Sequence, residues 1–225
     1  MFKGYILSLM SLVTLVSGFA QNKCSKYYPI KKGAQFTHTI FSDEPSNGGV
    51  EQGKVIYKVN EVGANWAFYT VKIEAMGFSR PEIKQKIVCT DQGVSITNQH
   101  SSAEKSDISG DSNFYLPNDL SATAVLDDVE MKLTHQGMAS ITRRITNRKV
   151  LGVNEAVTTP AGKFSCYKLT QTTKMGTFTT FDTQWMGEDV GIVKTVERDS
   201  GGNILSVTVL SSYYLPNNEQ PAAKF

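Results

Sequence analysis

Long apolar runs are missing from this sequence after its first 20 residues. A membrane-spanning helix needs about 20 consecutive apolar residues, and no later stretch of the chain approaches that length. The chain also lacks a strong net charge of either sign, because it has 23 basic and 21 acidic residues. The first absence predicts no later transmembrane segment. The second leaves no electrostatic basis for binding nucleic acid.

Histidine and cysteine are both scarce, with three of each in the chain. His38, His100 and His135 are far apart, and none has another histidine two or four residues away. A zinc site needs several such ligands to converge, and the cysteines are too few and too widely spaced to form one. We therefore expect isolated histidines, no bound metal and no cofactor.

Recognised catalytic motifs are absent as well, since the sequence has no Gly-x-Ser-x-Gly nucleophile elbow. Cys166 lies inside an expected strand, where a buried or disulfide-bonded cysteine is more typical than a nucleophile. The acidic pairs at 127–128 and 188–189 adjoin expected turns, where solvated carboxylates are more usual than a glycosidase pair. We therefore predict that the protein is not an enzyme.

The first 20 residues have the pattern of a secretory signal peptide. Lys3 supplies a positive charge, residues 6–16 form a short apolar core, and residues 17–20 (Ser-Gly-Phe-Ala) end in small side chains. The alternative, a buried N-terminal helix, would carry a polar pattern on one face, and this run carries none. We predict that residues 1–20 direct export and are removed, which leaves a soluble protein of the periplasm or envelope.

The three cysteines, Cys24, Cys89 and Cys166, would enter an oxidising compartment after export. One pair is then expected to form a disulfide, with one thiol left over. All three pairings stay open from the sequence, and the slow growth of loop-closure entropy favours Cys24–Cys89 slightly. Lys23 directly precedes Cys24, where a lipoprotein signal requires a small residue, so we expect free export rather than a lipid anchor.

The hydrophobic pattern from Gln35 onward has a period of two, as in β-strands. Phe36, His38 and Ile40 begin the alternation. Turn-forming runs at 159–162 (Thr-Pro-Ala-Gly) and 199–203 (Asp-Ser-Gly-Gly-Asn) separate later strands. About ten strands with short connections predict an all-β fold, an antiparallel curved sheet in the form of a half-barrel or open barrel.

The domain layout follows from this pattern. We predict a single β domain at 21–215 and a flexible tail at 216–225. The least regular part is 98–126: its first half is polar, and Leu120 to Leu126 is long enough for one helical turn. We expect this short irregular or helical segment to cross an open end of the sheet.

A basic cluster lies in the expected strand at 139–151. Regular strand alternation places Arg144 and Arg148 on one face and Arg143 and Lys149 on the other. The sequence therefore predicts charged flanks of a long strand rather than a single patch for phosphate or lipid headgroups.

Aromatic side chains are the main sequence signal for a ligand. Trp66, Phe68, Phe178, Phe181 and Trp185 fall on expected strands of a curved sheet. They are candidates to line a concave apolar face that holds an acyl chain. The alternative is that they are ordinary core residues.

Several motifs resemble one known family. Residues 158–164 read Thr-Thr-Pro-Ala-Gly-Lys-Phe, residues 166–168 read Cys-Tyr-Lys, and Trp185 precedes Val-Gly-Ile-Val-Lys at 190–194. The opening at 24–29 (Cys-Ser-Lys-Tyr-Tyr-Pro) also fits. This pattern is similar to the TapB-like exported family of Gram-negative envelopes. The resemblance implies a sheet similar to the lipoprotein-carrier (Lol-type) half-barrels and no catalytic residues.

Two functional hypotheses follow. The first is an exported periplasmic or envelope binding or carrier protein that shelters an apolar or lipid-like ligand in a β half-barrel. The second is a non-enzymatic envelope scaffold that binds a protein partner through a sheet edge or an apolar patch.

Overall fold

The computed structural model describes most of the chain from Lys26 to Pro216, namely residues 26–75, 78–79, 82–99, 106–110, 114–121, 124, 126–135 and 140–216. The predicted signal peptide at 1–20 and Cys24 lie outside these residues, as does the predicted tail after Pro216. No helix in the described part of the chain has the length and apolarity to span a membrane.

The described residues form one sheet of 14 strands, each paired antiparallel with its neighbours. The bounds of the strands, with one 3-10 turn, are β1 Gln35–Phe41, η1 Pro45–Asn47, β2 Glu51–Val62, β3 Trp66–Ala75, β4 Phe78–Ser79, β5 Ile83–Cys89, β6 Gly93–Gln99, β7 Ser106–Gly110, β8 Phe114–Pro117, β9 Val129–His135, β10 Ile141–Thr159, β11 Gly162–Met175, β12 Phe178–Gly187, β13 Gly191–Arg198 and β14 Ile204–Tyr214. The predicted all-β fold is confirmed, with several more short strands than expected.

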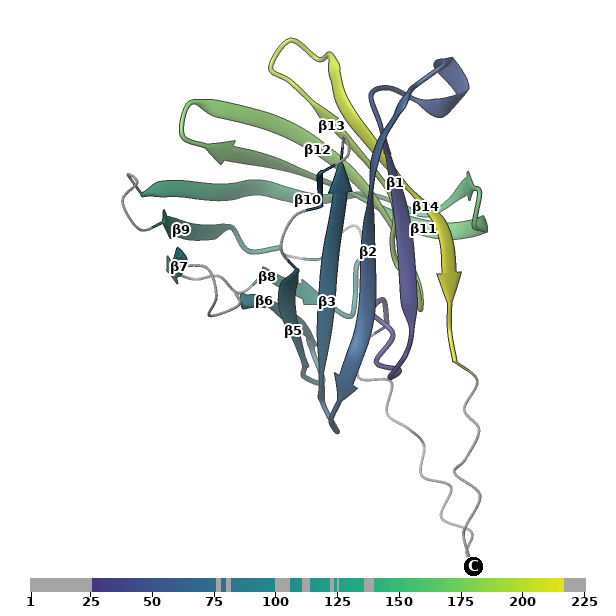
Figure 1. Ribbon diagram of the computed structural model, residues 1–225, viewed down its shortest axis with the longest axis vertical. Helices are drawn as coiled ribbons and strands as arrows, with labels where there is room; N and C mark the ends of the chain where they lie inside the picture. The colour runs from purple at the N-terminus through teal and green to yellow at the C-terminus, as the bar shows by residue number, and fades with distance from the viewer. Residues whose placement is uncertain are drawn as a thin grey trace, which may run out of the picture.

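The strand order is β7-β9-β10-β11-β12-β13-β14-β1-β2-β3-β5-β6-β8, with β4 paired to β3 alone. Figure 1 shows the sheet curled so that β9 to β12 run across the direction of β2 and β3. The two ends of the sheet approach each other, because Phe114 of β8 packs against Met131 of β9 and Ile145 of β10. This arrangement is the predicted open barrel.

From β6 to β9 the chain alternates between the two edges of the sheet. β7 pairs with β9 at one end, and β8 then pairs with β6 at the opposite end. The expected crossing is therefore present, although it contains strands. Residues 122, 123 and 125 of the expected helical turn at 120–126 lie outside the described residues. Leu120 and Leu126 are buried in the core, and the Ala124 N–H donates to the Ser121 carbonyl at 2.9 Å.

Local sequence explains the strands and turns. Aromatic and β-branched residues fill β3, as the strand preference of these residue types predicts. The predicted turn between β13 and β14 is present, and the Asp199 carboxylate accepts hydrogen bonds from the backbone N–H groups of Gly201 at 2.8 Å and Asn203 at 2.9 Å. Such side-chain bonds to the local backbone are the reason that Asp favours turns.

The residues before β1 cover one end of the inner face. Tyr27 is fully buried, and its ring meets the Tyr167 ring edge-on at a centroid distance of 5.6 Å. The Tyr69 hydroxyl donates to the Pro29 carbonyl at 2.6 Å. The Gly33 N–H donates to the Val59 carbonyl at 2.8 Å. These contacts hold the N-terminal segment against β2, β3 and β11.

The long strand β10 corrects two predictions. It has 19 residues and continues to Thr159, beyond the predicted end at Leu151. Asn147 and Asn154 have positive φ angles of 55° and 58°, and the pairing register with β11 shifts beside each. A bulge adds a residue and reverses the alternation beyond it. Arg148 is therefore on the inner face with Arg143, not on the opposite face as regular alternation predicted.

Candidate ligand-binding cavity

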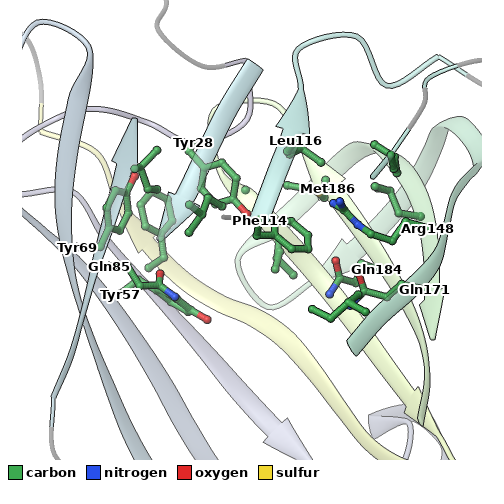
Figure 2. Close-up of a pocket in the computed structure, with 18 of the residues that line it drawn as sticks. Tyr28, Tyr57, Tyr69, Gln85, Phe114, Leu116, Arg148, Gln171, Gln184 and Met186 are labelled. Carbon is green, nitrogen blue, oxygen red and sulfur yellow. The ribbon is translucent and has the colours of Figure 1, made fainter. Parts of the chain in front are cut away.

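The inner face of the curled sheet contains a partly enclosed cavity of about 240 Å³. Its lining comes from both halves of the chain. Tyrosines of the N-terminal half lie at one end, and Arg148, Gln171 and Gln184 of the C-terminal half lie at the other (Figure 2). Phe114 lies between the two groups. The tyrosine side, here called the aromatic end, also includes Gln85, and the arginine side, here called the polar end, also includes Leu116 and Met186.

Three tyrosines, Tyr28, Tyr57 and Tyr69, form the aromatic end. Burial raises the pKa of each phenol above its ordinary value, so all three are neutral near pH 7. Gly191 lies beside the Tyr28 ring, where a Cβ would be at an ordinary contact distance of 3.5 Å. Gly191 also has a φ of +73°, a conformation that favours glycine.

His38 of β1 lies on the cavity wall and is 4% exposed. Its Nε2 lies 2.7 Å from the Ile192 carbonyl oxygen. A carbonyl only accepts, so Nε2 carries the proton and donates, which leaves Nδ1 as an unprotonated acceptor without a hydrogen-bond partner among the described residues. Burial lowers the pKa of His38, so the neutral imidazole is favoured.

Arg148 is the most deeply buried cation of the cavity wall, with 6% of its surface exposed. Its Nη1 donates to the Asp127 carbonyl at 2.6 Å, and its Nη2 donates to the Tyr115 carbonyl at 3.0 Å. The Phe114 ring lies 4.0 Å from the guanidinium carbon. Burial lowers the pKa of Arg148, yet a guanidinium stays charged at neutral pH. Arg148 thus connects β10 with β8 at the other end of the sheet.

A buried carboxylate lies on the same inner face, beside the polar end of the cavity. Asp182 accepts hydrogen bonds from the Gln171 amide at 3.2 Å, the Thr173 hydroxyl at 2.8 Å and the Thr180 hydroxyl at 2.9 Å. These donors compensate the charge of Asp182 and hold the Gln171 side chain in place.

The five aromatic residues proposed from the sequence lie outside this cavity. Trp66 and Phe68 contact each other at a centroid distance of 5.2 Å, on the face of β3 opposite Tyr69. Phe178 and Phe181 of β12 are 62% and 45% exposed.

The fifth, Trp185, is half-buried on the face of β12 opposite Gln184 and Met186. Its indole nitrogen donates to the Glu155 carboxylate at 2.9 Å, and the amines of Lys168 and Lys194 each lie 5.3 Å from its ring centre. The structure pairs Trp66 with Phe68 but does not bring the five together. A ligand role for them stays a prediction.

Sequence reasoning missed the tyrosines, His38 and Arg148. Both faces of β3 carry large apolar side chains, Phe68 on one and Tyr69 on the other, so the pattern did not identify the inner face. An available signal was Asn147, because asparagine tolerates positive φ and so marks strand positions where a bulge can form.

The cysteines fall into two states in the structure. Cys89 is disulfide-bonded, and Cys166 is a buried free thiol. Burial raises the pKa of the Cys166 thiol to about 11. Cys24 lies outside the described residues, so the predicted Cys24–Cys89 pairing stays a prediction.

Metal ligands do not gather in the described part of the chain. No group of three or more His, Cys, Asp or Glu side chains there could hold an ion. His100 lies outside the described residues, and the backbone of His135 ends β9.

Two solved structures are similar to this fold. A Bacteroides fragilis protein described as exported, with a YmcC-like fold, has 18% sequence identity and a TM-score of 0.69, over 85% of this chain and 100% of that chain. A Parabacteroides distasonis protein described as a lipoprotein has 18% identity and a TM-score of 0.68, over 84% of this chain and 99% of that chain. At this identity the likeness establishes the fold alone.

Sequence comparison identifies the family. None of the curated proteins matches the chain significantly. Residues 31–210 match the DUF3108-like family, a span that covers all the strands of the sheet except the last residues of β14. The protein therefore belongs to the DUF3108-like family.

Proposed function

We propose that this protein is an exported binding or carrier protein that holds an apolar or lipid-like ligand in its half-barrel. The observation that carries the proposal is the cavity of about 240 Å³, lined by aromatic and aliphatic side chains at one end. The similar structures described as exported and as a lipoprotein support an extracytoplasmic site of action. The narrower resemblance to TapB-like proteins and Lol-type carriers belongs to the same proposal.

The size of the cavity limits the ligand. About eight molecules of liquid water, at roughly 30 Å³ each, would occupy the same volume. Typical small-molecule pockets have roughly 300–1,000 Å³. A short acyl chain, or one end of a longer amphiphile, therefore fits without rearrangement of the sheet. Its binding would be stabilised by about 25 cal/mol for each Å² of apolar surface removed from water.

Binding without catalysis is part of the proposal. Cys166 is buried away from solvent, and His38 donates its one N–H to a backbone carbonyl. Neither residue is arranged as a nucleophile with an adjacent base.

The first experiment is to purify the mature protein gently from its own envelope and analyse an organic extract for lipid by mass spectrometry. A stoichiometric lipid is expected. Gln184→Trp would fill the polar end of the cavity and is expected to reduce the lipid content about tenfold or more, whereas Thr183→Trp on the opposite face of β12 is the matched control. Wild-type protein that is empty in repeated mild preparations would contradict the proposal.

The scaffold function is a second candidate, favoured by apolar side chains that the sheet leaves exposed. Leu151 and Val153 on β10 are 59% and 45% exposed, and Phe178 and Phe181 are exposed on β12. If these residues bind an envelope protein, Phe178→Ser with Phe181→Ser should abolish its co-purification. The lipid content of the cavity should then stay unchanged.

A further inference from the structure

The guanidinium of Arg148 is buried without a counter-ion. Both of its hydrogen bonds go to neutral backbone carbonyls, those of Asp127 and Tyr115, and it forms no ion pair with a described residue. Further N–H groups of the same guanidinium remain available to donate. A buried charge is costly in free energy unless an opposite charge compensates it, so this position favours the binding of an anion.

Nearby carboxylates do not fill this role. The side chains of Asp127 and Asp128 are exposed and act on Arg148 only through longer-range attraction. Asp182 is buried, but three neutral side chains donate to it, and it forms no ion pair with any described cation. Among the described residues, the cavity lining contains two arginines and no carboxylate.

The second arginine, Arg143, supports the same conclusion. It is half-buried on the cavity wall and has no hydrogen-bond or ion-pair partner among the described residues. The next residue, Arg144, points to the opposite face and forms an ion pair with Glu130 at 2.6 Å. The bulge at Asn147 brings Arg143 and Arg148 to one wall, so the positive charge is concentrated inside the cavity.

The chemistry of the cavity changes from one end to the other. Arg148 and Gln184 lie at the polar end, and Tyr28, Tyr57 and Tyr69 lie at the aromatic end (Figure 2). We infer that the ligand is an amphiphile with an anionic group, a carboxylate or a phosphate, that pairs with Arg148 and Arg143 while its apolar part lies toward the tyrosines. This inference rests on the proposed binding function and names its ligand class.

Arginine suits this role because its planar N–H groups can bind two oxygens of a carboxylate or phosphate at once. A neutral ligand of the same shape would displace water from both guanidinium groups and supply no compensating charge. It is therefore expected to bind more weakly than the anion. A purely structural role for Arg148, as a link between β8 and β10, predicts no such difference between ligands.

The test is calorimetric titration of the full mature chain, freed of co-purified ligand, with octanoate, octyl phosphate and 1-octanol. Both anions are expected to bind about tenfold or more tightly than 1-octanol. The tighter of the two identifies the headgroup class. Arg143→Gln should remove most of this preference, and Arg144→Gln is the matched control that should leave it intact.

The outcomes separate the inference from the proposed function. Equal affinity for the anions and 1-octanol would overturn the inference and leave the binding function standing. Binding of none of the three probes would overturn both.

The Arg148→Gln variant is first compared with the wild type by circular dichroism, because this substitution also removes the link to β8. If it unfolds, the Arg143→Gln and Arg144→Gln pair still decides the question, since the Arg143 side chain makes no hydrogen bond with a described residue.

Discussion

Burial acts on the ionisable side chains of the inner face in different ways. His38 responds by staying neutral, because its pKa is lowered and one ring nitrogen donates to a carbonyl. Arg148 cannot lose its proton near pH 7, so it stays positively charged, and no described residue forms an ion pair with it. The thiol of Cys166 is held in its protonated form by a pKa raised to about 11. Each of these states can be measured.

His38 makes the stability depend on pH. Its pKa is lower in the folded protein than the ordinary value of about 6.5, so the unfolded chain binds more protons below that pH. The contribution of His38 is therefore complete above about pH 6.5 and is lost as the pH falls toward the folded-state pKa. His38→Gln, which can keep a donor to Ile192, should flatten the decline of the unfolding free energy between about pH 6.5 and 5. An unchanged slope in urea titrations would contradict this assignment.

Cys166 should be inert in the native protein. We expect Ellman's reagent to find no reactive thiol at pH 8, because the thiolate is both inaccessible and disfavoured. Unfolding in guanidinium chloride without reductant should then expose one thiol if Cys24 and Cys89 form the predicted disulfide. Three thiols in the unfolded chain would contradict that disulfide, and rapid reaction of the native protein would contradict the burial of Cys166.

Among the strands, β10 has irregularities that determine which of its side chains face the cavity. Positive φ angles at Asn147 and Asn154 accompany register shifts that change which side chains face inward. A perfectly regular strand would separate Arg143 from Arg148. The bulge instead places both on the cavity wall and leaves Arg144 outside with Glu130.

Asn147 should therefore resist replacement by a β-branched residue. Asn147→Val is expected to lower the free energy of unfolding by about 1–2 kcal/mol, because a branched side chain disfavours positive φ. Asn147→Gly should have little effect, since glycine adopts this conformation freely. Denaturant unfolding compares both with Thr146→Val at a regular position of the same strand. Equal stability of the Val and Gly variants would show that the backbone conformation is not the constraint.

At the scale of the whole molecule, the sheet is continuous in its centre and held at its ends by side chains. β14 pairs with β1 along the length of β1, and this pairing joins the two halves of the chain. The ends meet through the contacts of Phe114 and Arg148, not through a further strand pair among the described residues. We therefore predict that the half-barrel opens between these two ends when it takes up the proposed ligand.

The contrast between the continuous centre of the sheet and its ends predicts that amide hydrogen exchange becomes faster from the centre to the ends. The amides of β13, β14, β1 and β2 should exchange most slowly, and those of β7 and β8 most rapidly, because short terminal strands with few contacts open locally. A bound anionic amphiphile should slow exchange in β8, whose Tyr115 carbonyl accepts from Arg148. Uniform protection across the sheet, unchanged by ligand, would contradict an opening at these ends.

Local sequence accounts for the all-β class, the antiparallel connections and the principal turns. Alternation from Phe36 onward and the turn at 199–203 are local properties, set by side-chain period and backbone preference. The sequence also located the irregular segment that crosses the sheet. It did not identify the cavity, because aromatic residues fill both faces of β3, and Trp66 and Phe68 lie opposite Tyr69.

Which face of the sheet is enclosed, and which side chains meet there, depends on contacts between distant parts of the chain. Curling of the sheet brings β8 against β9 and β10, which are distant in the strand order, so the contact of Phe114 with Arg148 has no local sequence signal. The bulge at Asn147 changes the facing of the residues directly beyond it, and it appears as a shift in the pairing with β11. The cavity and its uncompensated arginines are therefore products of long-range packing, whereas the strands that carry them follow from local pattern.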